Sequence, residues 1–230
     1  MNDDLPAGRT GDGLSSRLRR SCDAQIAAIR THPWITGAGN GTLTPAQIST
    51  WAGQDLLWGQ WWGPVMTAAA TAGPAQIQAA FKWLDDNMDT ELAWLRDMAS
   101  SAPQFPGADR IWPSYLGYAT WARQVSADFP LRALVIAWAC EASYHDAFTT
   151  VRDAGPRQPW AQWAAGENWG SARFAAMMAE MSAGLDAAYA AAEPLTEAAL
   201  LEDLIDAAQQ TYRWEAECWT AVYEGRGWPQ

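Results

Sequence analysis

Residues 44–62 read TPAQISTWAGQDLLWGQWW, and this stretch decides the class of fold. Thr44 can cap a helix that starts at Pro45, and Gln47 stands where it can complete a capping box. Beyond this start, apolar and aromatic residues recur at helical spacing and no β-branched run interrupts them. The stretch therefore predicts a long amphipathic helix with an unusually aromatic face.

The rest of the chain has the same helical character. Alanine is abundant, and glycine and proline fall mainly between periodic segments. Further helices are expected over residues 14–31, from 73 to about 100, over 113–126 and 130–154, near 160, from 171 to 194, and over 196–224. The helix that starts at residue 44 is expected to weaken at residues 63–64. Residues 37–41 and 102–107 are expected to be loops. The sequence thus predicts one all-α bundle of about seven or eight helices over residues 13–230, after a disordered tail at 1–12.

Charge and hydropathy exclude two classes of partner. The chain has 230 residues, with 26 acidic against 15 basic side chains and a net charge of −11. This balance argues against nucleic acid and anionic membrane surfaces, because phosphates require the opposite charge. No run approaches the roughly 18 apolar residues that a membrane span needs. The chain is therefore not expected to bind nucleic acid or to enter a membrane.

The cysteines and the N-terminus point to a reducing compartment. Cys22, Cys140 and Cys218 are far apart, and no CxxC pair is present. The first residues are polar and acidic, unlike a signal peptide. A cytoplasmic location with free thiols is the expectation.

Four expected helical faces carry polar groups among apolar ones. Residues three or four apart share a face of a helix. The four sets are Trp51, Asp55, Trp58 and Trp62; Ala137, Cys140, Tyr144 and Phe148; Ala208, Thr211, Glu215, Cys218 and Val222; and Tyr115, Tyr118 and Ala122. If these faces point inward, carboxylates, thiols and tyrosines meet in an aromatic pocket, where a buried carboxyl gains a raised pKa and can donate protons.

Each of these residues also has a purely structural interpretation. Asp55 can accept a hydrogen bond from an indole N–H across helices. Cys140 and Cys218 can be small core residues, since free cysteine is among the most buried residue types. Glu215 can be a solvated acid, and the tyrosines can be core residues with surface hydroxyls. Periodicity alone therefore predicts a bundle with a polar, tryptophan-lined pocket and no more.

Several of these residues lie in motifs that resemble those of the TenA (thiaminase II) family. The matches, in chain order, are His32-Pro33-Trp34; Gly41-Thr42-Leu43-Thr44 with Trp51 and Gln54-Asp55; Pro113-Ser114 with Tyr118; Cys140 with Tyr144; Trp163 with Trp169-Gly170-Ser171 and Phe174; and Glu215 with Cys218-Trp219. They cover about residues 25–224. The resemblance implies a haem-oxygenase-like all-α fold, a homotetramer or homodimer, no cofactor, and hydrolysis of a C–N bond in thiamin or an aminopyrimidine.

The resemblance also implies roles for five residues. Cys140 would be the nucleophile that adds to the pyrimidine ring. Glu215 would protonate the leaving group and later activate water. Asp55 would bind the ring nitrogen and the exocyclic amine, while Tyr144 and Tyr118 would position the ring and tune the thiol. Two carboxylates of different pKa can divide acid and base roles in this way.

The chain departs from the family pattern at the pocket wall. Trp58 and Trp169 stand where the family has tyrosine, and Cys218 replaces a ring-stacking phenylalanine. Together with Trp51 they are expected to contact the substrate. Tryptophan is bulkier than tyrosine and cannot accept a hydrogen bond. An alternative is therefore an enzyme of the same fold that acts on a more apolar or aromatic metabolite.

Two further alternatives belong to other classes. A di-iron oxidase needs glutamates each followed by histidine three residues later, but Trp94 follows Glu91, and His32 and His145 are the only histidines. Glu141 and His145 could share one ion at most, so no metal is expected. The second alternative is a non-catalytic protein that binds a ligand. Such a protein has less need of a thiol beside a carboxylate, so the presence of both argues against it.

Overall fold

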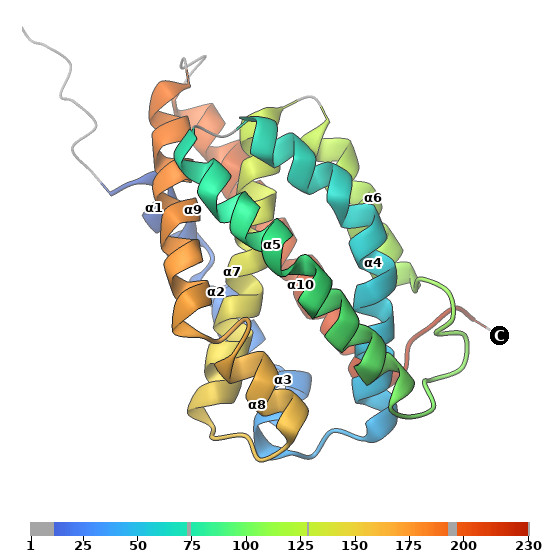
Figure 1. The fold of residues 1–230 in the computed structure, drawn as a ribbon. Coiled ribbons are helices and arrows are strands. Elements are labelled where there is room, and N and C mark those ends of the chain that lie inside the picture. Colours follow the sequence, from blue (N-terminus) through green and yellow to red (C-terminus); the bar gives the residue numbers. More distant parts are fainter. Residues whose placement is uncertain (1–11, 73–74, 128, 193–196, 230) are drawn as a thin grey trace, which may run out of the picture.

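The chain forms an all-helical bundle with its long helices running roughly along one direction (Figure 1). The computed structural model describes residues 12–72, 75–127, 129–192 and 197–229, so the expected tail lies, apart from Asp12, outside the described residues. Within those ranges there are ten helices and no strand: α1 Leu14–Ser21, α2 Asp23–Arg30, α3 Pro33–Asn40, α4 Pro45–Ala72, α5 Ala75–Ser100, α6 Pro113–Ser126, α7 Pro130–Asp153, α8 Pro159–Gly166, α9 Ala172–Ala191 and α10 Glu197–Glu224. None of these described helices is both long and apolar enough to cross a bilayer. The all-α prediction is confirmed.

Helix α4 begins as predicted but continues further. The Thr44 amide donates to Gln47 Oε1 at 2.8 Å, and the Gln47 amide donates to Thr44 Oγ1 at 3.3 Å, which completes the capping box. The helix then runs through Pro64, where weakening was expected. A proline removes only one ladder hydrogen bond, and α4 packs along both α5 and α7, which offsets that loss.

The first expected helix is divided in two. Residues 14–31 form α1 and α2, which meet at Cys22 (φ −100°, ψ 9°). The break lets α1 pack on α9 and α10 while α2 packs on α7 and α10. The break between α1 and α2 therefore depends on tertiary packing, and no residue pattern in this segment predicts it.

The loop predicted at residues 37–41 is wrong, because residues 33–40 are helical and only Gly41, at φ 73°, leaves the helix. Gly39 serves close packing here: a β-carbon at that position would lie 2.8 Å from the β-carbon of Ala154 after α7. His32 caps the start, since its Nδ1 accepts the Trp34 amide at 3.1 Å. Glycine in this segment lets α3 lie against α7 and does not mark a loop.

Helix α7 is the centre of the bundle and carries Cys140. It packs against α2, α3, α4, α6, α8, α9 and α10, and Figure 1 shows α5 crossing in front of it. Most of its residues from Leu131 to Val151 are buried. A helix that is apolar on all sides is typical of such a central position.

A buried carboxylate ties the N-terminal helices to this centre. Asp146 on α7 accepts hydrogen bonds from Arg19 at 2.9 Å and from Arg30 at 2.8 Å, and Tyr212 donates to it at 3.1 Å. These guanidinium groups hold the pKa of Asp146 below its ordinary value despite burial. These hydrogen bonds explain why the charge of Asp146 can be buried, and Asp146 is not one of the candidate active-site residues.

Candidate active site

A cavity of about 1060 Å³ opens between α4 and α5 and reaches α7. The polar side chains that line its inner end are Asp55, Glu91, Cys140, Glu141 and Tyr144, with Trp169 beside them. Its outer part is lined by apolar and polar side chains that include Trp58, Trp62, Met66, Phe81 and Lys82. Because α7 is central, the thiol and the carboxyls lie at the bottom of this cavity.

Cys140 is buried and its thiol is protonated in the free site. Only 3% of the residue is exposed. Burial raises the pKa of Cys140 well above its ordinary value, and the nearby charges of Glu215 and Glu141 raise it further, whereas Tyr118 lowers it. The thiol can act as a nucleophile only if a neighbouring group accepts its proton.

Glu215 on α10 is that neighbouring group. It is 2% exposed, so the interpretation as a solvated acid is wrong. Burial raises its pKa to about 7, while Tyr118 and Cys140 counteract the rise. Its Oε1 has no hydrogen-bond partner among the described residues. A carboxyl with this pKa exists in both protonation states near neutral pH and can both accept and donate a proton.

Asp55 on α4 faces the same region and is bound to Tyr144. The Tyr144 hydroxyl donates to Asp55 Oδ2 at 2.6 Å, so the carboxyl binds a phenol and not the indole weighed from sequence. Burial raises the pKa of Asp55 well above its ordinary value, although Tyr144 opposes that shift. Asp55 can therefore hold a proton for a ring nitrogen.

Two further carboxyls line the inner cavity and were considered from sequence only as metal ligands. Burial raises the pKa of Glu91 to about 7, against the opposing hydrogen bond from Asn168 Nδ2, which is 3.0 Å from Glu91 Oε2. Burial, together with Glu91 and Glu215, raises the pKa of Glu141 to about 8. The sequence pattern could have indicated Glu91 as a site residue, because it is a charged residue on the helical face that carries Leu84, Met88 and Leu95 on α5.

These raised pKa values predict that the protein loses stability as the pH rises. Each group binds a proton in the folded state at pH values where the unfolded chain has lost it, so the free energy of unfolding falls between about pH 5 and pH 8. At pH 8, Glu141→Gln is expected to raise it by about 1–3 kcal/mol, because a neutral amide replaces a buried charge. At pH 5 the variant and the parent are expected to match. Urea unfolding at both pH values measures this, and equal stabilities at pH 8 would contradict it.

The predicted aromatic residues divide between the cavity wall and the core. Trp58 and Trp169 line the cavity, and Trp58 stacks on Trp62 with ring centroids 4.5 Å apart. Tyr118 lies behind Trp58, at 5.3 Å between centroids. Its buried hydroxyl has no hydrogen-bond partner of normal geometry among the described residues, although it is close enough to Cys140 to affect that pKa.

Trp51 and Cys218 are not among the residues that line the cavity. Trp51 is fully buried between Trp34 and Trp169, at 4.9 and 6.0 Å between centroids. A core role replaces its predicted contact with substrate, because the rings of Trp34 on α3, Phe148 on α7 and Trp160 on α8 enclose it. Cys218 is also buried and lies beside Ser114 on α6.

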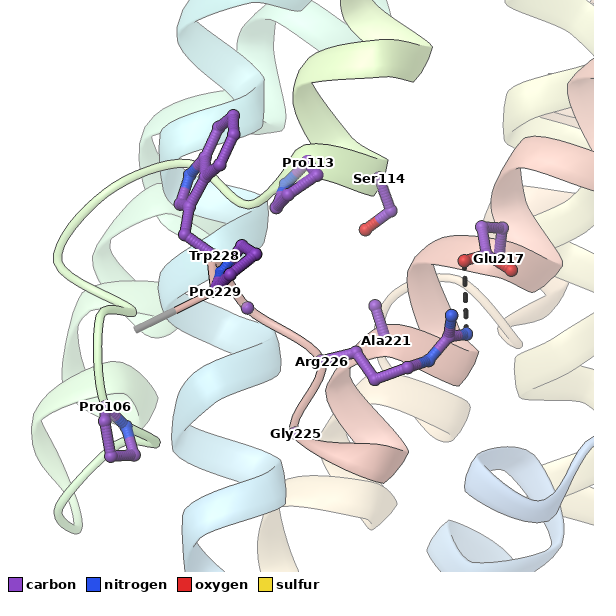
Figure 2. A pocket seen from close by; sticks show the side chains of 10 residues that line it. Pro106, Pro113, Ser114, Glu217, Ala221, Gly225, Arg226, Trp228 and Pro229 are labelled. Carbon is purple, nitrogen blue, oxygen red and sulfur yellow. Dashed lines mark ion pairs between the residues drawn. The ribbon is translucent and has the colours of Figure 1, made fainter.

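A second hollow of about 640 Å³ lies where α10 ends, as Figure 2 shows. It is lined by Pro106, Pro113, Ser114, Glu217, Ala221, Gly225, Arg226, Gly227, Trp228 and Pro229. An ion pair of 3.1 Å joins Arg226 to Glu217 on the α10 side of the hollow (Figure 2). None of the site residues predicted from sequence lines this hollow.

Both histidines are engaged elsewhere. His145 Nδ1 lies 2.8 Å from the Trp169 carbonyl oxygen, and His32 Nε2 lies 3.0 Å from Thr220 Oγ1. In the described ranges no group of three or more His, Cys, Asp or Glu side chains is arranged to hold a metal ion.

Solved structures share this fold, although no protein-family model and no curated protein matches the chain. A TenA homologue from Pyrococcus furiosus is 14% identical, with a TM-score of 0.77 over 91% of this chain and 100% of the homologue. A TenA family transcription regulator from Silicibacter is 15% identical, with a TM-score of 0.77 over 91% and 96% of the two chains. A protein named as a TenA-like thiaminase from Sulfolobus solfataricus is 17% identical, with a TM-score of 0.68 over 94% and 98%. The chain therefore has the all-α, haem-oxygenase-like fold of the TenA proteins.

Proposed function

We propose that this protein is a hydrolase that cleaves a C–N bond of an aminopyrimidine, in thiamin or one of its breakdown products, through a covalent intermediate on Cys140. The observation that carries the proposal is the position of the Cys140 thiol. It lies at the bottom of the cavity, next to Glu215 and Tyr118 and facing the same space as the Asp55–Tyr144 pair. A thiol beside a carboxyl that titrates near pH 7 suits nucleophilic catalysis.

The first step forms a bond between sulfur and the ring. Asp55, which holds a proton, donates it to a ring nitrogen and so makes the ring electrophilic. The Cys140 thiol passes its proton to the Glu215 carboxylate as the sulfur adds to the ring. Tyr144 keeps Asp55 in place through its 2.6 Å hydrogen bond.

The second step breaks the C–N bond. Glu215 returns the proton to the departing nitrogen, and the amine or thiazole leaves. Glu215 then accepts a proton from water as the water oxygen adds to the exocyclic carbon. The C–S bond breaks, Asp55 recovers its proton from the ring, and Glu215 passes the proton that it took from water to the departing Cys140 sulfur. The net reaction is hydrolysis.

The cavity itself favours a second candidate, a bulkier heteroaromatic amine. Its volume of about 1060 Å³ is just above the roughly 300–1000 Å³ of ordinary ligand pockets. The flat faces of Trp58 and Trp62 extend the wall beyond the area that one pyrimidine ring can cover. The same thiol and carboxyl chemistry would apply to this larger substrate.

Mass spectrometry of substrate turnover tests the proposal. Purified protein is incubated with thiamin and, separately, with the aminomethyl-pyrimidine, beside its Cys140→Ala variant. We expect the hydroxymethyl-pyrimidine product from the parent and a loss of at least about a thousandfold in kcat from the variant. Release of product at equal rates from both proteins would remove the nucleophile from the proposal, and no turnover by the parent would favour the bulkier amine.

A further inference from the structure

We infer that Glu91 and Glu141 form a second carboxyl subsite in the cavity, and that the substrate is an aromatic compound with two cationic nitrogen groups. The inference rests on the proposed function in its second form, the bulkier heteroaromatic amine, because thiamin and the aminomethyl-pyrimidine each carry one cationic group. It adds one requirement for the substrate, namely a second amine or amidine away from the bond that breaks. The roles of Cys140, Glu215 and Asp55 in the reaction do not call for this second group.

The two carboxyls share the inner cavity but belong to different helices. Glu91 lies on α5 and Glu141 on α7, next to Cys140, and both line the space. Asn168 fixes Glu91 through one hydrogen bond to Oε2. The Glu141 carboxyl makes no side-chain hydrogen bond or ion pair with any described residue and so remains available to a ligand. The proposed reaction uses neither group.

Charge compensation for these carboxyls is missing from the described part of the protein. Glu91 and Glu215 both act on Glu141, and no lysine, arginine or histidine is among the groups that act on any of the three carboxyls. Lys82 and Arg96 also line the cavity, but both are exposed; Lys82 pairs with Asp86 at 2.7 Å, and Arg96 is not among the groups that act on Glu91. A buried carboxylate without a cation is costly, so a cationic ligand that supplies the partner binds favourably.

The aromatic wall supports the same class of ligand. Trp62 is only 5% exposed, lines the cavity and has an indole N–H without a partner in the described residues, which leaves a donor for an acceptor atom of the ligand's ring and not for its cationic groups. Its stacked neighbour Trp58 offers a flat face to a ring, and tryptophan faces attract cations. The cavity of about 1060 Å³ has room for a ring with an arm on each side.

Calorimetric titration of the Cys140→Ala protein separates binding from chemistry. The probes are 1,4-bis(aminomethyl)benzene, benzylamine and benzyl alcohol, which share a ring and carry two, one and no ammonium groups. We expect the diamine to bind about tenfold more tightly than benzylamine, and the alcohol to bind most weakly. Adding Glu141→Gln or Glu91→Gln is expected to weaken diamine binding about tenfold and benzylamine binding by no more than about twofold.

Glu217→Gln is the matched control, because it removes a carboxylate from the second hollow and leaves the cavity untouched. It is expected to change neither affinity. The inference is overturned if the diamine binds no better than benzylamine, if no probe binds, or if the two glutamate variants weaken both amines equally. Turnover by the parent protein, which tests the proposed function, does not enter this result.

Discussion

Glu215→Gln is expected to lower kcat/KM of the Cys140-dependent reaction by about 10²–10⁴-fold, the usual contribution of a general acid–base group. Glutamine has nearly the same shape, so the cavity persists. It can neither accept the thiol proton nor return one to the leaving nitrogen. Because Glu215 is 2% exposed beside Cys140, bulk water cannot readily replace it.

The pH profile identifies the role of Glu215. Burial raises its pKa to about 7, and the first step needs the carboxylate form, which accepts the proton of the Cys140 thiol, so kcat/KM of the parent is expected to rise as the pH rises through 7. The Glu215→Gln variant should lack this rise. Initial rates from pH 5.5 to 9 measure it, with Glu217→Gln, on the same helix but at the other hollow, as the control. An unchanged pH profile in the glutamine variant would show that Glu215 does not carry the proton.

Trp51→Ala is expected to lower the free energy of unfolding by about 3–5 kcal/mol, as removal of large buried aromatic side chains commonly does. Trp51 is fully buried and its ring contacts Trp34, Phe148 and Trp160 at 4.9–6.0 Å between centroids. Its loss leaves a cavity that several large rings cannot fill by small movements. The effect is on stability because the side chain does not line the substrate cavity.

Urea unfolding measures this difference, and two variants serve as controls. Trp51→Phe keeps a ring and should cost less than Trp51→Ala. Trp61→Ala, at a residue 36% exposed that contacts Arg123, should change stability by no more than about 1 kcal/mol. If Trp51→Ala kept its stability while KM rose, the substrate contact first predicted from the sequence would be correct after all.

The sequence was sufficient for the fold class because its signals are local. The capping box at Thr44 and Gln47 and the prolines at 113, 130 and 159 start helices where the structure has them. Local signals failed where packing competes with them. Gly39 indicated a loop but lies in a helix, and the helix expected to weaken at Pro64 continues to Ala72.

For the candidate site, helical spacing brought out Asp55, Cys140, Tyr144 and Glu215, because a polar residue on an apolar face is visible in one segment. It assigned Trp51 to the same site, since one face of α4 carries both Trp51 and Asp55. Spacing within one helix cannot tell which part of a face meets a cavity and which part meets the core. That division depends on the position of α5 and α7 against α4.

The sequence by itself determined an all-helical chain with no disulfide pattern, and a short list of residues able to do thiol and carboxyl chemistry. The tertiary structure decided which of them meet. It brought α4, α5, α7 and α10 together so that Glu91 and Glu141 join the inner cavity and Glu215 lies beside Cys140. The reason is physical: helix formation follows from interactions among near neighbours, whereas burial, and with it the pKa of each of these groups, arises only when distant helices exclude water from the same space.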